Sequence, residues 1–480
     1  MIDSVVLRRK IIDAAVFGEL TDHISTEGNA DVWLKEHGCG LSNVSNINED
    51  VTLPSNWCWT TLSSITDENT LNDGNWVLSA DMVSDGPVKL IQLGSIGEGV
   101  YRNKGFKYLT EEHFHELKGR QIFPGHLLIN RLVADRMVSC IIPDLDGILM
   151  TAVDVCWVAP QDELYSLKYI MYAISTSLFQ QRVNELGHGV TRFRISKNNL
   201  IDIPFPFPPL KEQLRIVEIV EDLFSITYNI DDLQTRYAAD RDVLKGKLID
   251  AAICGKLTKQ LPEDGTAEDL YKKIQEEKKQ ILIERKGRAD KKIKEIDADV
   301  PFAIPTQWKW IRFGDVGLFK KGPFGSALTK SMFVPKSDNT VKVYEQQHAI
   351  KKNCNLGTYY IKREYFDSDM SGFEVLTGDI IVSCAGTIGE TYIMPDEIEQ
   401  GIINQALMRV TLAAGIDKRF FQYYFDANLK KSAQDESNGS AIKNIPPFDV
   451  MKNWYFPLPP FAEQQRIVET LDNLLTNLTE

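Results

Sequence analysis

The sequence lacks the motifs that identify many nucleotide-binding and metal-binding enzymes. It has no Gly-x-x-x-x-Gly-Lys-Ser/Thr phosphate loop and no Gly-x-Gly-x-x-Gly dinucleotide fingerprint. Its seven cysteines form no Cys-x-x-Cys pair, and no two histidines stand four residues apart. Zinc sites and disulfide frameworks usually show such spacings. We therefore predict no catalytic residue, no metal site and no bound cofactor in this chain.

Long hydrophobic runs are missing as well. No stretch approaches the roughly 18 apolar residues of a membrane span. The first residues also lack the apolar core and the small-residue cleavage site of a signal peptide. Positive charge is in deficit, since the net charge is −13. We expect a cytoplasmic protein that does not coat nucleic acid uniformly, although this balance leaves room for local basic patches.

What the sequence does contain is an internal repeat. The stretch PFPPLKEQLRIVEIVEDLF at 206–224 returns as PLPPFAEQQRIVETLDNLL at 457–475. Two further pairs of stretches are also similar to each other: LPSNWCWTTLSSI with IPTQWKWIRFGDV (53–65 and 304–316), and LRRKIIDAAVFGELT with LKGKLIDAAICGKLT (7–21 and 244–258). The middle of the chain carries all three parts in order, whereas the two ends share them. This order indicates a circularly permuted two-fold repeat.

The repeat divides the chain of 480 residues into five regions. Two mixed segments combine strand-like runs with amphipathic helix-like runs, which indicates two similar α+β domains. Helical regions lie between and around them. The predicted regions are an N-terminal partial helical region (1–53), a first domain (54–209), a central helical region (210–304), a second domain (305–460) and a C-terminal partial helix (461–480). The block 22–53 shows no obvious similarity to its central counterpart.

A long helix is predicted directly after the first proline-rich stretch. Proline disfavours helix before Leu210, and apolar residues then recur every seven positions. One stripe contains Ile216, Leu223, Ile230, Tyr237 and Leu244, and a second contains Ile219, Ile226 and Leu233. Such heptads predict a coiled-coil seam with an antiparallel helix built from the two chain ends. A second helix, 268–296, is charged, and both a solvated linker and a partner-docking role stay open for it.

Local basic patches are the remaining chemical signal. Residues 318–352 hold seven lysines against two acids, and residues 182–197 hold four Arg and Lys against one. Cations beside Gln, Asn and Ser suit phosphate docking and base-edge readout. A basic face on a soluble protein is also often only solvated, so the patches by themselves leave both interpretations open.

The motifs together resemble the specificity subunit of a type I restriction–modification system. The similarity rests on the duplicated PLPP-x-x-EQ-x-x-IV pattern, each copy closing a domain that opens with P-x-x-W-x-W. Further similar stretches are KKGPFGSAL, GDIIVSCAGTIG, IINQALMRV and IDAAICGKLT (320–328, 378–389, 402–410 and 249–258). The resemblance implies two target-recognition domains, separated by two long antiparallel coiled-coil helices, each reading one half of a bipartite, asymmetric site in double-stranded DNA.

The resemblance also implies partners. Two modification subunits, which are adenine methyltransferases, would dock on the helices, and restriction subunits would join through them. The chain itself would be non-catalytic, with S-adenosylmethionine, ATP and Mg on the partner subunits. Basic surfaces of those partners would neutralise much of the DNA phosphate charge, which would account for the acidity of this chain.

Candidate contact residues follow from the basic runs and from loops after strands. The DNA-binding candidates are Arg102, Lys104, Arg131, Arg136, Arg192 and Arg194 in the first domain, and Lys320, Lys321, Gln346, Gln347, Ser383 and Thr387 in the second. The partner-binding candidates begin the two duplicated helices: Glu212, Gln213, Arg215, Glu463, Gln464 and Arg466. Plain helix capping is an equal explanation for this last group.

Two other classes stay open on the sequence. A self-sufficient DNA methyltransferase would bind S-adenosylmethionine, but the missing cofactor loop opposes it. A coiled-coil scaffold with protein partners only would not bind random duplex DNA, whereas a specificity subunit is expected to bind it.

Overall fold

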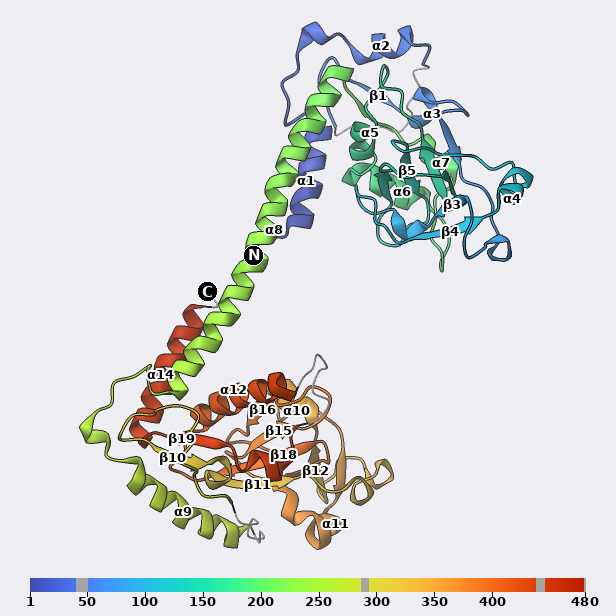
Figure 1. Cartoon of the computed structure of the whole chain (residues 1–480). Helices are drawn as coiled ribbons and strands as arrows, with labels where there is room; N and C mark the ends of the chain where they lie inside the picture. The colour runs from blue at the N-terminus through green and yellow to red at the C-terminus, as the bar shows by residue number, and fades with distance from the viewer. Residues whose placement is uncertain (40–50, 286–292, 437–444, 479–480) are drawn as a thin grey trace. The chain divides into compact units, whose positions relative to one another are not determined.

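The computed structural model describes residues 1–39, 51–285, 293–436 and 445–478. These residues form two compact units, unit 1 (Met1–Arg236) and unit 2 (Tyr237–Glu480) (Figure 1). The boundary falls inside one continuous helix, α8 (Leu210–Ile253). None of the described helices combines the length and the apolar character needed to cross a bilayer.

Unit 1 is built on two small sheets. The first has the strand order β2-β8-β5-β6 with all neighbours antiparallel, and the second has the order β4-β3-β7, in which β3 and β7 are parallel. The strands are β2 (Leu71–Asp73), β3 (Val88–Ile91), β4 (Phe106–Leu109), β5 (Leu127–Asn130), β6 (Val138–Ile141), β7 (Ile148–Thr151) and β8 (Val155–Val158).

Unit 2 repeats this topology with one additional strand in its second sheet. Its first sheet has the order β11-β18-β15-β16, and its second has the order β13-β12-β17-β14, with β12 parallel to β17. The strands are β11 (Gly317–Lys321), β12 (Thr340–Tyr344), β13 (Tyr360–Lys362), β14 (Glu374–Val375), β15 (Ile380–Ser383), β16 (Thr391–Ile393), β17 (Gly401–Ile403) and β18 (Leu407–Leu412). Both units are therefore similar α+β folds, as the internal repeat predicts.

A two-stranded ribbon ties the start of each mixed segment to its end. In unit 1, β1 (Cys58–Thr60) pairs antiparallel with β9 (Phe205–Phe207). In unit 2, β10 (Lys309–Arg312) pairs antiparallel with β19 (Tyr455–Leu458). The first strand of each ribbon is the Trp-x-Trp segment and the second precedes the proline-rich stretch, so the repeated motifs meet in space. The domain limits 54–209 and 305–460 stay predictions.

Short helices cover the sheets, with side-chain caps at several starts. Ser166 and Thr176, for example, accept backbone N–H groups at the first turns of α5 and α6. In unit 2, Phe421 and Phe425 of α12 pack with Ile380 and Val382 of β15 in the core. Besides α8, the described α-helices are α1 (Ser4–Val16), α2 (Ala30–Glu36), α3 (Leu62–Ile65), α4 (Glu111–Glu116), α5 (Leu167–Ala173), α6 (Ser177–Leu186), α7 (Lys197–Ile201), α9 (Ala267–Glu284), α10 (Gln346–Ile350), α11 (Arg363–Tyr365), α12 (Lys418–Glu436), α13 (Phe448–Met451) and α14 (Phe461–Asn477).

Helix α8 begins at the predicted residue, but its predicted seam is only partly buried. Ile216 and Val220 lie in the core of unit 1, and Ile249 and Ile253 lie in the core of unit 2. Of the heptad residues between them, Leu223 and Ile230 are half-buried, and four are exposed: Ile226, Leu233, Tyr237 and Leu244. The seam prediction is therefore wrong for these four residues within this chain, because the described part of the chain lays no apolar partner on them.

The helices from the two chain ends each accompany one part of α8. In unit 1, α1 runs antiparallel to α8, since Ile2 bonds to Gln234 through its N–H (2.7 Å) and Arg8 pairs with Asp231 (3.0 Å), nearer the start of α8. In unit 2, Leu471 of α14 shares the core with Ile253.

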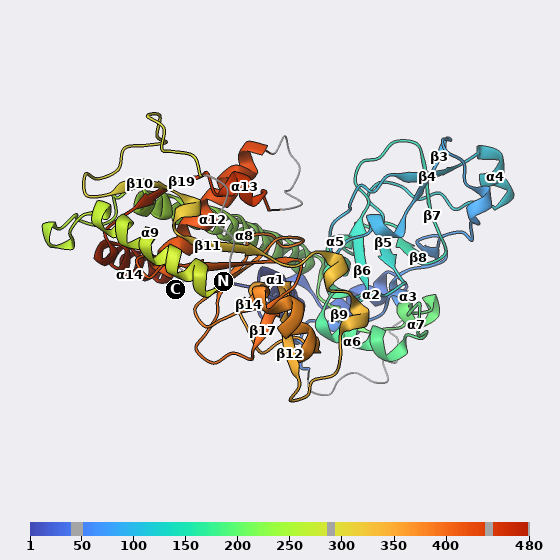
Figure 2. The ribbon, with the colours of Figure 1, turned by 90° about the horizontal axis from the view of Figure 1, so that it is seen from below.

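The charged helix predicted over 268–296 is α9, which ends at Glu284, and residues 286–292 lie outside the described residues. Within unit 2, α9 lies near β11 (Figure 2). The Tyr271 hydroxyl of α9 lies 3.4 Å from Asp315.

Candidate nucleic-acid interface

Several loops of unit 2 gather at one edge of its sheets. Strands β11 and β15 both pair antiparallel with β18, so both end where β18 begins. The Gly322 N–H donates to the Leu407 carbonyl (2.9 Å), and the Cys384 N–H donates to the Ala406 carbonyl (2.8 Å). The second sheet joins them, because the Asn404 N–H donates to the Tyr344 carbonyl (3.0 Å) at the end of β12. We call the segments 321–328, 345–347, 384–390 and 404–406 the loop edge of unit 2.

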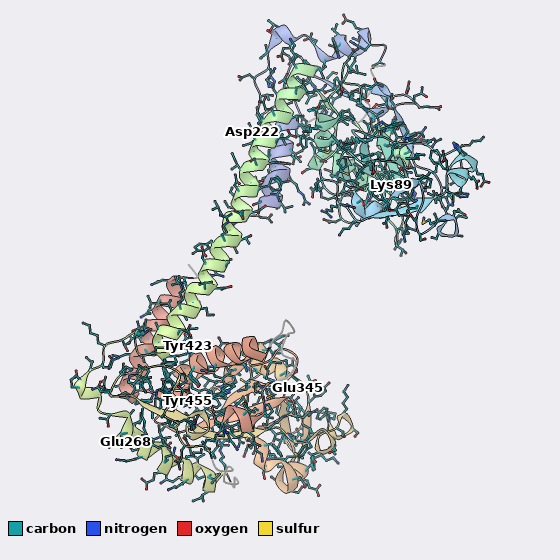
Figure 3. The ribbon with its side chains drawn as sticks, viewed as in Figure 1. Lys89, Asp222, Glu268, Glu345, Tyr423 and Tyr455 are labelled. Atoms are coloured by element: carbon teal, nitrogen blue, oxygen red, sulfur yellow. The ribbon has the colours of Figure 1, made fainter. Side chains whose placement is uncertain are left out.

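Most DNA-binding candidates of unit 2 lie on or beside this loop edge. Lys320, Lys321 and Thr387 are exposed, and Gln346 and Gln347 are half-buried. Gln346 donates to the Ala385 carbonyl, and Gln347 donates to Glu345 (2.9 Å), which is labelled in Figure 3. The Lys320 ammonium lies 4.6 Å from the centroid of the Phe373 ring. The structure thus brings together four separate stretches of sequence, three of which carry a cation or an amide.

Ser383 needs a correction as a DNA-contact candidate. Its side chain is fully buried, so it has no surface with which to touch DNA. The hydroxyl donates to the Thr387 carbonyl (2.5 Å) and accepts the Glu390 N–H (3.0 Å). Ser383 therefore shapes the small-residue loop, in which Gly386 and Gly389 adopt positive φ angles of 67° and 81°.

Unit 1 has an equivalent loop edge. Here β2 and β5 both pair antiparallel with β8, and Asn75, just after β2, bridges to Ala152. The loop 187–195 joins them through the bridge between Leu132 and Arg194. We call the segments 74–78, 131–137, 152–154 and 187–195 the loop edge of unit 1.

The burial of Arg131 argues against it as a DNA-contact candidate. Its side chain is 8% exposed and lies 3.0 Å from Asp73. It also donates to the carbonyls of Ile195 (2.8 Å) and Val153 (2.6 Å). Burial raises the pKa of Asp73 despite this neighbouring guanidinium. Arg131 therefore joins three segments of the loop edge from inside.

The other candidates of unit 1 keep accessible surface to different degrees. Arg136 is largely buried, donates to the Ser175 carbonyl (2.7 Å), and has a pKa lowered by burial. Arg192 and Arg194 are exposed, and each lies 3.9 Å from Asp154. Arg102 and Lys104 are exposed in the turn after β3. Contact of these residues with DNA stays a prediction.

The start of each duplicated helix is held by one repeated network. Glu212 accepts from the Trp57 indole (2.9 Å), and Glu463 accepts from the Trp308 indole (2.8 Å). Thr21 donates to Glu212 and Thr258 donates to Glu463, at 3.0 and 3.1 Å. The side-chain oxygen Oε1 of Gln213 accepts the Ser166 N–H (2.9 Å), and Oε1 of Gln464 accepts the Asp417 N–H (2.8 Å).

These contacts decide where the partner-binding candidates lie. Glu212, Gln213, Glu463 and Gln464 are fully buried, and a side chain with no exposed surface makes no direct contact with a second protein. Their role in the structure is to join the helix starts to the mixed domains. Arg215 and Arg466 are partly exposed, so the prediction of a partner surface is left to them.

The same network reveals two residues that the sequence analysis missed. Glu27 accepts from Arg215 (2.5 Å), and Asp264 accepts from Arg466 (2.8 Å). A glycine with positive φ, Gly28 or Gly265, follows each acid. Block 22–53 therefore does resemble its central counterpart up to the start of α2. The register of the third repeat pair, continued past Thr21, would have found it.

Two histidines, His113 and His115, lie on α4 with one residue between them, and His113 lies 3.2 Å from Glu116. Across residues 1–39, 51–285, 293–436 and 445–478, however, no group of three or more His, Cys, Asp and Glu is placed to hold a metal ion. That the chain works without a cofactor stays a prediction.

Comparisons with known proteins converge on one family. The family model described as type I restriction modification DNA specificity domain matches residues 148–235 and 305–480. The EcoAI specificity subunit of Escherichia coli, a type I restriction enzyme subunit, is 22% identical over 98% of this chain and 88% of its own length. The EcoEI specificity subunit of Escherichia coli is also 22% identical, over 64% of this chain and 60% of its own.

A solved structure also shares the fold. It was determined in work on the assembly and conformational transition of the type I R-M system. It matches with a TM-score of 0.57 at 17% identity, covering 89% of this chain and 92% of the other.

Proposed function

The chain belongs to the type I restriction modification DNA specificity family, and from this premise we propose that unit 1 and unit 2 each read one half of a bipartite, asymmetric sequence in double-stranded DNA. As a specificity subunit it is a non-catalytic DNA-recognition component of a type I restriction–modification system. We also propose that it works in the cytoplasm.

One observation carries the two-reader proposal. The two units share strand order and loop edges, yet the exposed side chains on those edges differ. Unit 1 presents Arg192 and Arg194, whereas unit 2 presents Lys321, Thr387 and two half-buried glutamines. Arginine pairs with guanine edges, and glutamine suits adenine. The same scaffold with different chemistry supports two half-sites of different sequence.

The helices supply the seat for partners in this proposal. Residues Ile226, Leu233, Tyr237 and Leu244 lie on one face of α8, since their spacing of seven and four residues returns to the same side of a helix. All four are exposed. A stripe of this kind suits an apolar helix of another protein. We propose that two adenine-methyltransferase subunits dock along the helices, that restriction subunits join through them, and that S-adenosylmethionine, ATP and Mg bind on those partners.

The reading half of the proposal is tested by mapping methylated adenines in a host that carries this chain with its modification subunits. We expect one bipartite motif with two different halves and a nonspecific spacer. A palindromic motif would contradict two different readers, and a motif that does not change when this chain is exchanged would contradict DNA recognition by it.

The docking half is tested with Leu233→Glu on α8. Because the side chain is exposed, the variant should fold like the parent, but the complex with the modification subunits should lose mass on a sizing column. Ala239→Glu is the matched control, since Ala239 is exposed on the opposite face of the same helix. An intact Leu233→Glu complex would remove α8 from the partner interface.

A further inference from the structure

Each loop edge carries one large aromatic side chain at the same position of the repeat. The edge strand β2 continues as Gly74-Asn75-Trp76, and its counterpart β11 continues as Gly322-Pro323-Phe324. Trp76 is 66% exposed and Phe324 is 88% exposed. The two units thus place an aromatic ring in solvent at matched points, although the residues between glycine and aromatic differ.

The glycines explain why both loops leave the strand in the same way. A Cβ on Gly74 would lie 2.3 Å from the Thr151 carbonyl oxygen, and one on Gly322 would lie 1.8 Å from the Asn404 carbonyl oxygen. Any larger residue would push the loop off the neighbouring chain. The close approach therefore directs the following residues outward over the loop edge.

Further contacts hold each aromatic residue in place. In unit 1, the Asn75 amide donates to the Leu117 carbonyl (3.1 Å), and Asn75 accepts the Arg120 N–H (2.9 Å). In unit 2, Pro323 is buried, and the Ala327 N–H donates to the Phe324 carbonyl (2.9 Å). The backbone is anchored directly before the ring in unit 1 and on both sides of the ring in unit 2, so the exposure is built into the loop.

The neighbours of the rings favour nucleic acid as the occupant. Lys320 and Lys321 directly precede the loop of Phe324. Arg192 and Arg194 lie beside Asp154, which is two residues from the Ala152 that bridges to Asn75. An apolar protein surface would have to desolvate these cations, whereas DNA phosphates would pair with them. Proteins that combine such cations with a single exposed aromatic can insert the ring between base pairs.

We propose that Trp76 and Phe324 act as wedges, each entering a base step of the half-site that its unit reads and unstacking it. The proposal rests on the proposed reading function and adds the contact by which each unit deforms its half-site. Specificity would then include the cost of opening that step, which is lowest at pyrimidine–purine steps.

The test uses the full chain assembled with its modification subunits and duplexes of the methylated motif, each with one 2-aminopurine, whose fluorescence rises when it unstacks. The parent should raise the signal at one step in each half-site. Phe324→Ala should abolish the rise in one half only and weaken binding by about 5- to 150-fold, the range for one lost stacking contact. Trp76→Ala should do the same in the other half, and Phe324→Leu should keep part of the signal.

Phe123→Ala is the matched control, because Phe123 is an exposed aromatic residue of unit 1 outside the loop edge, and it should change neither readout. Parent-like affinity and fluorescence in both Ala variants would overturn the wedge while leaving DNA reading intact. A loss of complex mass with unchanged DNA binding would assign the rings to a protein contact and overturn it too. A parent complex that binds no duplex would overturn both proposals.

Discussion

Arg131 and Arg192 show, at the scale of single residues, how burial divides one residue type between two tasks. Both lie on the loop edge of unit 1, but the Arg131 side chain is 8% exposed and that of Arg192 is 72% exposed. The buried Arg131 guanidinium contacts one carboxylate and two carbonyls and so stabilises the fold, whereas the exposed Arg192 guanidinium is accessible to a DNA phosphate. The two residues should therefore fail in different ways when they are replaced.

We expect Arg192→Ala to leave the free energy of unfolding unchanged and to lower the salt slope of DNA binding by about one, as the loss of one phosphate contact does. Arg131→Ala should instead lower the free energy of unfolding by about 3 kcal/mol, because it leaves Asp73 buried without its partner. Urea titration and binding isotherms at several salt concentrations measure both. Arg236→Ala, at the same 72% exposure on α8, is the control and should change neither. An unchanged slope for Arg192→Ala would remove it from the interface.

The ion pair between Arg466 and Asp264 should make stability depend on pH. The hydrogen bond from Arg466 lowers the pKa of Asp264 below its usual value. A carboxyl whose pKa is lower in the folded protein stabilises the fold above its unfolded pKa of about 4, and this contribution is lost as the pH falls through the folded pKa. The destabilisation caused by Arg466→Gln should therefore be larger at pH 7 than at pH 3 in urea titrations. A destabilisation of equal size at both pH values would contradict it.

Sequence patterns predict which residues reach the loop edges better than which of them face outward. Arg131 and Arg136 follow a strand in a polar context, which fits exposure, yet burial of Arg131 depends on Asp73 from a distant strand. Ser383 likewise has a sequence context of small residues that suggests an accessible side chain. In the structure the loop that follows folds over Ser383, and its hydroxyl bonds to the Thr387 carbonyl. Tertiary contacts of this kind leave no local signal.

At the scale of elements, α8 shows what a heptad pattern does and does not predict. The prolines before Leu210 fixed the start, and the apolar repeat from Ile216 to Leu244 covered most of the helix. The pattern could not say which protein covers the stripe, because an apolar face is equally compatible with a partner in the same chain and in another. That is why the middle of the helix was predicted as buried and is found exposed.

The length of α8 should set the distance between the two half-sites. Four residues added between Thr235 and Asp240 lengthen the helix by about 6 Å and rotate its end by about 40°. One to two base-pair steps of about 3.4 Å, at about 36° per step, match this change. We expect unchanged half-sites with a spacer that is one or two pairs longer, read by mapping methylated adenines.

An insertion of two residues is the contrasting variant. It rotates the end of the helix by about 200°, so the second unit would face away from its groove and DNA binding should be lost. A four-residue variant whose spacer equals that of the parent would show that another element sets the distance.

At the scale of the whole molecule, the net charge of −13 limits what the chain does alone. Phosphate repulsion over most of its surface should leave weak DNA binding with a small salt slope. Addition of the modification subunits should steepen the slope by several units if their basic surfaces neutralise phosphates. Binding isotherms of the chain with and without these subunits give both slopes, and equal values would contradict this division of charge.

The duplication made the whole fold more predictable than any single element. Repeated motifs in order implied two copies of one topology, and the matched strand orders of the two units confirm it. The three-strand and four-strand second sheets differ, since β14 joins only the sheet of unit 2 among the described strands. The two repeats do not correspond in sequence around β14, so the repeat could not predict this extra strand.

The ribbons β1–β9 and β10–β19 have an evolutionary consequence. Because each ribbon joins the first and last strands of its mixed segment, the segment leaves the helical frame and returns to it at neighbouring backbone positions. The buried Trp–Glu contacts at 2.9 and 2.8 Å lie beside these junctions and repeat in both units. Recombination at the two flanking motifs could therefore replace a whole segment as a cassette without disturbing the frame. A lineage carrying this gene could acquire a new target in one genetic exchange, with its helices inherited unchanged.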